Sequence, residues 1–238
     1  MNDKNKYIAL TTGEPAGIGP ELVVQLLQDP VTDHLCIFAD PDLLLERATL
    51  IGASLAIKGD TLFGPGGTAH IYPIELNESS IAGDLDIKNA PYVIDMLTRA
   101  VDGCLTGEFA AMVTAPVQKS TLIEAGNVFV GHTEFLAERA GVPKPVMMLA
   151  NDRLRVALVT IHMPLSEVPG AITQESLEAV LRVIDADLRR CFQISNPVIG
   201  VCGLNPHAGE SGHLGKEEQE VISPVLERLC LEGFDLRG

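Results

Sequence analysis

Pro197-Val-Ile-Gly-Val201, followed by Cys202-Gly-Leu-Asn-Pro-His-Ala-Gly-Glu-Ser-Gly-His-Leu-Gly215, is the stretch that decides the fold class. Its apolar start is typical of a buried parallel strand, and the polar residues 216–220 after it predict the start of a helix. The segment between them is therefore a loop at the carboxyl end of a strand, where open α/β sheets place their ligands. Because it combines an amide, imidazoles and a carboxylate with four glycines, we expect a functional loop rather than a solvated linker.

Length and composition limit the classes of protein. The 238 residues are many for one domain and few for two, and a hydrophobic fraction of 46% with 4% aromatic residues predicts a sizeable aliphatic core. The formal net charge of −15 argues against nucleic-acid partners and anionic membrane surfaces, because both attract clustered Lys and Arg. A phosphorylated small molecule stays open as a substrate, since a helix N-terminus and one or two cations suffice locally.

The cysteines and the apolar runs bear on the cellular compartment. The five cysteines are widely spaced and form no CxxC motif, which indicates free thiols in a reducing environment. The sequence has neither a signal peptide nor an apolar run of membrane-spanning length. We therefore expect a cytoplasmic, soluble protein without a membrane partner.

Strand and helix patterns alternate along the whole chain, which predicts an α/β architecture with a mostly parallel sheet. Residues 52–80 are predicted to be irregular apart from an edge strand at 69–74, and Asn151-Asp152 is predicted to be a hairpin turn. Strands are expected at 7–11, 35–39, 110–113, 145–149, 154–160 and 197–201. Helices are expected at 20–27, 43–51, 87–102, 120–125, 131–139, 173–192 and 216–229.

A glycine-rich turn at residues 12–19 joins the first predicted strand to the first helix. Pro20 and Glu21 suit the first turn of that helix. The glycine spacing matches neither the dinucleotide motif GxGxxG nor the P-loop. A tight βα turn and an anion site beside Glu14 therefore both remain open.

Two histidines follow apolar predicted strands. His162 and His207 each stand near a proline, and two neutral imidazoles suit a transition-metal ion. Their wide separation in the sequence is also compatible with unrelated histidines. His213 is a further candidate, although its flanking glycines could equally mark an exposed turn.

The segment Gly131-His-Thr-Glu-Phe135 places an imidazole and a hydroxyl at a predicted helix start. Either Thr133 is the N-cap, or His132 and Thr133 hold an anionic group together with the free helix amides. Lys119 could add a positive charge there or remain solvated. No GxSxG nucleophile elbow occurs, so a serine hydrolase is unsupported, and no catalytic residue is identified.

Five motifs occur in order along the chain: TGEPAGIGPE at 12–21, TAPVQK at 114–119, GHTEF at 131–135, TIHMPL at 160–165 and GLNPHAGE at 203–210. Together they resemble the 4-hydroxythreonine-4-phosphate dehydrogenase family of pyridoxal 5′-phosphate biosynthesis. The continuation SGHLG at 211–215 is more similar to this family than to its relatives that act on four-carbon sugar-acid phosphates.

The resemblance implies an isocitrate/isopropylmalate dehydrogenase-like fold, with two α/β/α domains and a cleft between them. The first α/β domain would span residues 1–128, and the second, with the metal ligands and probable dimer contacts, residues 129–238. Relatives continue past the final helix, in a segment that completes the first domain and supplies a third metal histidine. The chain is therefore expected to be C-terminally incomplete, with a weakened metal site and little turnover of its own.

The resemblance also implies a reaction. The family oxidises 4-phosphohydroxy-L-threonine with NAD or NADP to a 3-oxo acid, which loses carbon dioxide to give 3-amino-2-oxopropyl phosphate. It implies a divalent metal (Zn, Mg or Co), a nucleotide bound in the interdomain cleft, and a homodimer with active sites at its interface. A dehydrogenase of a four-carbon sugar-acid phosphate and a phosphate acyltransferase of similar fold are the alternatives.

Site residues carry over from the family only where its motifs match this chain. His132 and Thr133 are similar to substrate-binding residues, and His162 and His207 to two of three metal-binding histidines. Lys119, Asn205 and Glu14 are candidates for anion or cofactor contacts.

Overall fold

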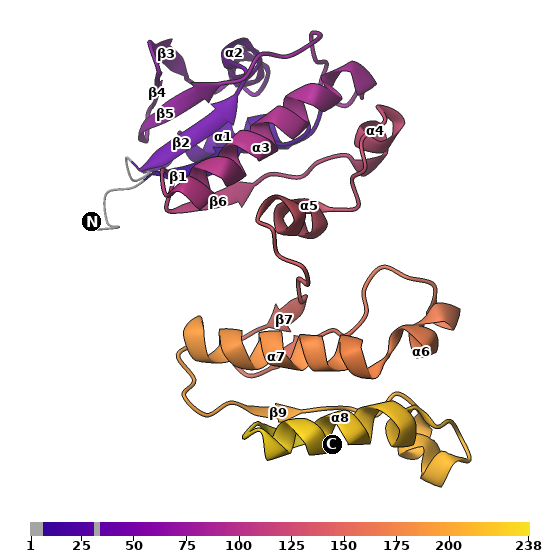
Figure 1. The fold of residues 1–238 in the computed structure, drawn as a ribbon. Coiled ribbons are helices and arrows are strands. Elements are labelled where there is room, and N and C mark those ends of the chain that lie inside the picture. Colours follow the sequence, from indigo (N-terminus) through magenta and orange to yellow (C-terminus); the bar gives the residue numbers. More distant parts are fainter. Residues whose placement is uncertain (1–6, 31–33) are drawn as a thin grey trace. The chain divides into compact units, whose positions relative to one another are not determined.

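The computed structural model describes residues 7–30 and 34–238, and the chain forms two compact units, Met1–Pro143 and Lys144–Gly238 (Figure 1). This division falls later in the chain than the boundary predicted at 128/129. The reason is that Phe129 and Phe135 pack into the hydrophobic cluster of unit 1. Within the described residues, no helix is both long and apolar enough to cross a bilayer.

Unit 1 alternates strands and helices, as the sequence predicts, and most boundaries agree within a few residues. Its strands are β1 (Ile8–Thr11), β2 (Leu35–Ala39), β3 (Ala56–Lys58), β4 (Thr61–Gly64), β5 (Gly67–Pro73) and β6 (Ala111–Thr114). Its helices are α1 (Gly19–Leu26), α2 (Pro41–Leu50), the 3-10 helix η2 (Ile87–Asn89), α3 (Ala90–Thr106), α4 (Lys119–Glu124) and α5 (His132–Arg139).

The described part of unit 1 holds a six-stranded sheet in the order β3-β4-β5-β2-β1-β6. β1 pairs in parallel with β2 and β6, and β2 pairs in parallel with β5. β3, β4 and β5 pair antiparallel, so the sheet is mixed. The carboxyl ends of β1, β2 and β6 meet at one edge, and the loops that follow them lie there.

The prediction that residues 52–80 are irregular is wrong. Two-residue turns at Gly59-Asp60 and Pro65-Gly66 join β3, β4 and β5, and Gly59 takes the left-handed conformation (φ +59°) that such turns favour. A Gly-Asp pair between short apolar runs is a hairpin signal that the sequence did contain. β5 is also not an edge strand, because β2 and β4 pair with its two sides.

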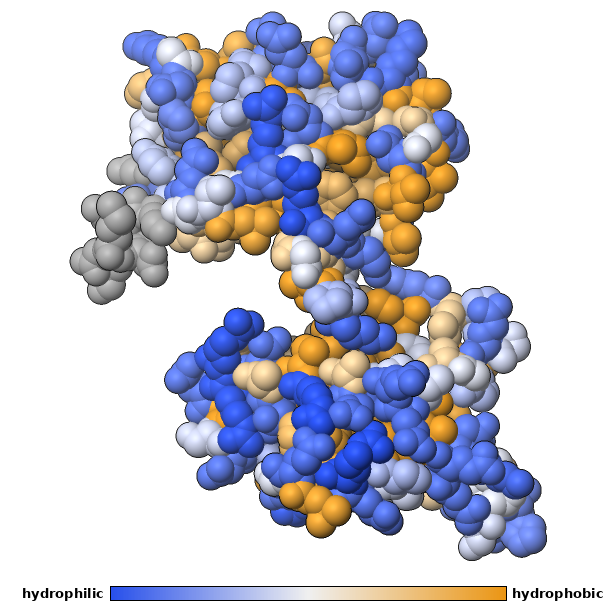
Figure 2. All heavy atoms as spheres, in the orientation of Figure 1, coloured by the Kyte–Doolittle hydropathy of each residue, from blue (hydrophilic) through white to orange (hydrophobic). Residues whose placement is uncertain are grey.

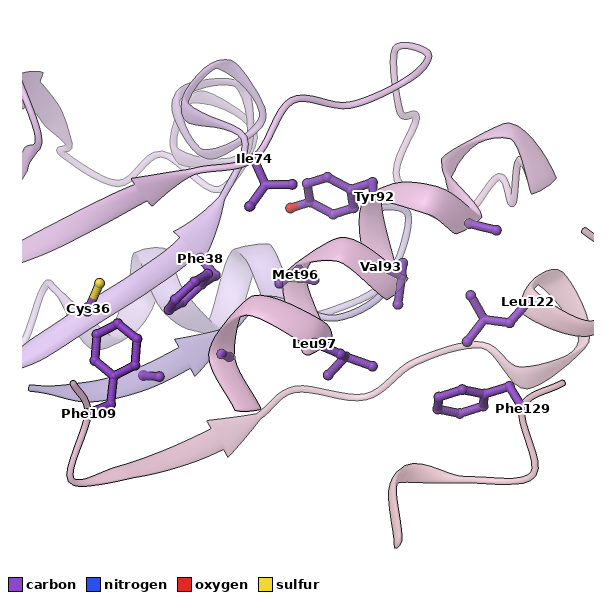
Figure 3. Close-up of a cluster of buried hydrophobic side chains, with 13 residues drawn as sticks. Cys36, Phe38, Ile74, Tyr92, Val93, Met96, Leu97, Phe109, Leu122 and Phe129 are labelled. Carbon is purple, nitrogen blue, oxygen red and sulfur yellow. The ribbon is translucent and has the colours of Figure 1, made fainter. Parts of the chain in front are cut away.

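The core of unit 1 lies on both faces of the sheet, because successive strand residues point to opposite faces. Phe38 packs against α3, whereas its neighbour Ile37 packs against α1 and α2. Figure 3 shows the first cluster, with Cys36 and Phe38 on a strand and Met96 on α3. The apolar residues 110–113 are typical of a buried strand, but β6 forms the edge of the described sheet, with Val113 54% exposed.

Unit 2 is built around two long helices. Its helical elements are the 3-10 helix η3 (Leu165–Glu167), α6 (Val168–Ala171), α7 (Gln174–Arg190), the turn segment η4 (Pro206–Gly212), the π-helix η5 (Glu218–Ile222) and α8 (Ser223–Leu231). Its strands are β7 (Met148–Ala150), β8 (Arg155–Ala157), β9 (Val198–Gly200) and β10 (Asp235–Arg237). α7 begins with a capping box, in which the side chains of Thr173 and Ser176 each accept the other's backbone N–H.

The strands of unit 2 are shorter than predicted and form two separate pairs. β7 and β8 form an antiparallel hairpin around the predicted turn at Asn151, and β9 pairs in parallel with β10. The strand predicted at 154–160 ends at Ala157, so it does not reach His162. β9 is not a buried strand, since only one side packs against the helices and Val198 is 53% exposed.

Candidate functional site

The turn between β1 and α1 is closed by its own hydrogen bonds. The N–H groups of Ala16 and Gly17 donate to the carboxylate (3.2 Å) and the carbonyl (3.0 Å) of Glu14. Glu14 is buried, which raises the pKa of its carboxyl, while the N–H of Ala16 acts in the opposite direction. These contacts favour a tight βα turn over an anion cradle, because amides that would bind an anion already have partners.

Gly13 brings this turn against the loop that follows β6. Its φ is +70°, and a Cβ atom there would lie 2.2 Å from the carbonyl oxygen of Pro116. The N–H of Glu14 donates to that same carbonyl (3.0 Å). The loops carrying Glu14 and Lys119 are therefore neighbours at one edge of the sheet, as expected for parallel strands.

A buried hydroxyl network fixes the ends of β1 and β2. Thr12 Oγ1 donates to the carbonyl of Phe38 (3.1 Å) and lies 3.0 Å from the hydroxyl of Tyr92. That hydroxyl also accepts the N–H of Asp40 (3.4 Å), and Asp40 is the N-cap of α2. Burial raises the pKa of Tyr92 to about 12. The sequence marked Tyr92 only as an apolar helix position, since a polar contact across the sheet leaves no local signal.

The start of α5 brings three of the predicted site residues together. Gly131 is the N-cap, so the alternative in which Thr133 caps the helix is wrong. A Cβ atom on Gly131 would lie 3.4 Å from Lys119 Nζ, which places the ammonium group beside the helix start. His132 and Thr133 are the first residues of the helix and are half-buried.

Charged groups of both signs lie at this helix start, because a Cβ atom on Gly131 would also lie 2.9 Å from Glu134 Oε2, nearer than Lys119 Nζ. Burial lowers the pKa of His132, and the charge of Lys119 lowers it further. The ring packs edge-on against Phe129, with a centroid distance of 6.0 Å. His132 Nε2 is buried and has no hydrogen-bond partner among the described residues. A neutral imidazole, an ammonium group and the first amides of α5 can together receive a negatively charged group.

In unit 2, the loop after β9 adopts a left-handed turn. His207, Ala208, Glu210 and Ser211 have φ between +42° and +59°, and Gly209 lies between them at +76°. The left-handed conformation costs roughly 1–2 kcal/mol for each non-glycine residue. Four such residues in one turn require strong contacts from the surrounding structure.

Those contacts come mainly from two glutamates at the start of the next helix. Glu218 Oε1 accepts the backbone N–H groups of Leu204 (2.8 Å) and Asn205 (2.7 Å). The side chain of Asn205 donates to Glu217 (2.6 Å) and to Glu218 Oε2 (3.0 Å). The bonds from Asn205 hold the pKa of the Glu218 carboxyl below its ordinary value. The sequence placed Glu218 only in the polar start of a helix and missed this role.

The two histidines proposed as metal ligands both lie in unit 2 and are exposed. Each has a left-handed backbone, with φ of +50° at His162 and +52° at His207. Histidines that share a metal from two strand ends would stand on neighbouring or nearly neighbouring strands, but β8 and β9, which precede them, belong to different two-stranded sheets. Over residues 7–30 and 34–238, no group of three or more His, Cys, Asp or Glu side chains is arranged to hold a metal ion. The described residues therefore do not form a complete metal site.

Comparison with known proteins points to one family. The family model of the pyridoxal phosphate biosynthetic protein PdxA matches residues 31–238. The 4-hydroxythreonine-4-phosphate dehydrogenase of Serratia proteamaculans is 48% identical over 98% of this chain and 72% of its own length. That of Thioalkalivibrio sulfidiphilus is 52% identical over 97% of this chain and 71% of its own length.

Solved structures agree with the sequence relatives. A crystal structure of 4-hydroxythreonine-4-phosphate dehydrogenase from Klebsiella pneumoniae matches 100% of this chain and 74% of its own, with a TM-score of 0.83 and 29% identity. A terephthalate 1,2-cis-dihydrodiol dehydrogenase from Burkholderia xenovorans LB400 shares the fold, with a TM-score of 0.59 and 21% identity.

The fold and its relatives define an α/β enzyme of the oxidoreductase class, since the matched relatives are dehydrogenases. The chain belongs to the PdxA family of pyridoxal phosphate biosynthetic proteins. This confirms the resemblance that the five ordered motifs indicated.

Proposed function

We propose that the chain acts in pyridoxal 5′-phosphate biosynthesis by oxidising 4-hydroxythreonine 4-phosphate to a 3-oxo acid, which loses carbon dioxide to give 3-amino-2-oxopropyl phosphate. The observation that carries this proposal is the 48% and 52% identity to dehydrogenases of that name over nearly the whole chain. The start of α5 supports it, because this reaction needs a site for a phosphorylated, anionic substrate.

In the proposed complex, His132 and Thr133 bind the anionic part of the substrate. The first amides of α5 donate to it, and Lys119 supplies a positive charge from the side of Gly131. The buried Nε2 of His132 supports this assignment, because a buried ring nitrogen without a partner gains a hydrogen bond when a ligand fills the space beside it. Asn205 in unit 2 is a further candidate contact.

The oxidation requires NAD or NADP as hydride acceptor. We propose that the nucleotide binds in a cleft between two α/β/α domains, as in isocitrate and isopropylmalate dehydrogenases. The closed β1–α1 turn at Glu14 supports this placement over a Rossmann-type site, because amides of that turn are already bonded within the protein.

We further propose that His162 and His207 are two ligands of a divalent metal (Zn, Mg or Co). Their neutral imidazoles suit zinc or cobalt better than magnesium, which prefers oxygen ligands. Both stand on left-handed backbone, and the bonds of Glu218 to Leu204 and Asn205 hold the loop that carries His207, which supports a positioned imidazole there.

A homodimer completes the proposal, with active sites at the interface. Ile123, Val128 and Val130 are 55%, 94% and 51% exposed, which is costly for hydrophobic side chains that remain in water. Figure 2 shows hydrophobic residues at the surface of unit 1 around α4 and the segment after it. We also place the protein in the cytoplasm, supported by its five free cysteines.

Titration calorimetry with 4-hydroxythreonine 4-phosphate tests the function, together with the absorbance of reduced nicotinamide in the presence of NAD or NADP and Zn, Mg or Co. The expected result is saturable binding that His132→Ala weakens about tenfold or more, as for the loss of one hydrogen bond to a charged group. His70→Ala is the matched control, because His70 lies on β5 of the same unit. Absence of binding, or release of thiol from an acyl-CoA in place of nicotinamide reduction, contradicts the proposal.

A further inference from the structure

The carboxylate of Glu218 lies inside the loop that carries Asn205 and His207. It is only 8% exposed, although it belongs to a helix whose neighbouring polar residues face the solvent. One of its oxygens accepts two consecutive backbone N–H groups at the entrance of the loop, those of Leu204 and Asn205. Bonds of this kind to an ionised acceptor are among the strong hydrogen bonds of proteins.

The same carboxylate also touches the centre of the left-handed turn. A Cβ atom on Gly209 would lie 2.8 Å from Glu218 Oε2, and one on Gly203 would lie 3.3 Å from Oε1. Gly209 is buried there, and its carbonyl accepts the N–H of Leu214 (2.9 Å). Glu218 therefore contacts the chain on both sides of His207.

We propose that Glu218 is a positioning residue, whose carboxylate holds residues 203–215 in the left-handed turn and so fixes the direction of the His207 imidazole. The importance of the His207 ring direction for the reaction rests on the proposed function. The conformational part does not, since it follows from the contacts of Glu218 and the backbone of residues 207–211. The unfavourable φ values of this turn make it dependent on an outside support.

The test uses the 238-residue chain with Glu218→Ala, Glu218→Gln and, as control, Glu220→Gln. Glu220 lies two residues further along and is exposed, and its carboxylate forms an ion pair with Lys216 (3.8 Å) on the same helix start. Glu218→Gln keeps one oxygen acceptor for the two backbone N–H groups. Its new NH2 group, however, faces the NH2 group of Asn205, so two donors meet where a donor and an acceptor met before. The two substitutions should therefore differ in degree.

Two measurements need no enzyme activity. Hydrogen exchange of the Leu204 and Asn205 amides should accelerate about tenfold or more in Glu218→Ala and less in Glu218→Gln, in line with the loss of charge-assisted hydrogen bonds. The imidazole resonances of His207, followed at one fixed pH, should shift in the same order, whereas those of His70 in unit 1 should not. The control should match the wild type in both.

Kinetics then test the link to the reaction. In the dehydrogenase assay, Glu218→Ala should lower kcat about tenfold or more and raise the KM for the phosphorylated substrate by less, because the contacts proposed at α5 are kept and only the candidate contact of Asn205 is disturbed. Unchanged exchange and unchanged His207 resonances in Glu218→Ala would overturn the proposal whatever the activity. An ordered loop in a wild-type chain that fails to bind the substrate would instead contradict the proposed function and leave the positioning role supported by the exchange data.

Discussion

Tyr92→Phe should destabilise unit 1 through the loss of a single oxygen atom. The tyrosine side chain is 1% exposed, and its hydroxyl lies 3.0 Å from Thr12 Oγ1. Thr12 donates its own proton to the carbonyl of Phe38, so the hydroxyl of Tyr92 is the donor in the contact between the two side chains. The substitution removes this donor and keeps the ring that packs between α3 and the sheet.

The magnitude follows from what each group loses. Thr12 loses an incoming hydrogen bond but keeps its bond to Phe38, and the N–H of Asp40 loses only a long contact of 3.4 Å. The expected cost is therefore about 1 kcal/mol, the usual net value of one buried neutral hydrogen bond. Thr12→Val should cost more, about 1–3 kcal/mol, because it leaves the buried phenol without its acceptor.

Intrinsic fluorescence during urea unfolding measures these costs. The chain has three tyrosines and no Trp, and Tyr7, Tyr72 and Tyr92 all lie in unit 1, so the signal reports on that unit. Tyr7→Phe is the matched control, since Tyr7 is 40% exposed and should shift the free energy of unfolding by less than about 0.5 kcal/mol.

The double variant provides the refutation. If the two hydroxyls are bonded, the cost of Tyr92→Phe with Thr12→Val should fall below the sum of the single costs by about 1 kcal/mol. Additivity to within about 0.3 kcal/mol would show that the contact contributes nothing, and the hydroxyl network would not hold the ends of β1 and β2 together.

Three further predictions concern the site. Gly13→Ala should lower the free energy of unfolding by more than about 2 kcal/mol, because the new Cβ would lie 2.2 Å from the carbonyl oxygen of Pro116. Gly52→Ala is the control: Gly52 has a similar φ of +68° but no neighbour within 4 Å, so this variant measures the backbone penalty alone. Equal costs for the two variants would show that the Cβ atom at position 13 does not collide with Pro116. Lys119→Met should raise the pKa of His132 in an NMR titration by removing a nearby positive charge, and an unchanged pKa would place the ammonium elsewhere. Because the pKa of folded His132 lies below its usual 6.5, the contribution of this residue to stability should be present above that pH and lost as the pH falls below it. Denaturation measured at several pH values should therefore show that the free energy of unfolding falls less on acidification in His132→Gln than in the wild type.

Several features were determined by the sequence alone, because their causes lie within a few residues. Asp40 caps α2 with its own carboxylate, and Thr173 and Ser176 cap α7, as their residue types predict. Pro20 stands in the first turn of α1, where its missing N–H costs nothing. The alternation of these elements gave the α/β class, and five ordered motifs gave the family.

Only the tertiary structure decided which elements meet. The position of β5 inside the sheet depends on pairing with β2, whose residues lie about thirty positions earlier, and sequence patterns do not encode such distant partners. Likewise, nothing in the sequence pairs Lys119 with His132, and only the fold brings the Lys119 ammonium group beside the start of α5. Glu218 shows the limit most clearly: its sequence context is that of a solvated helix start, and only the folding of residues 203–215 back onto that helix turns its carboxylate inward.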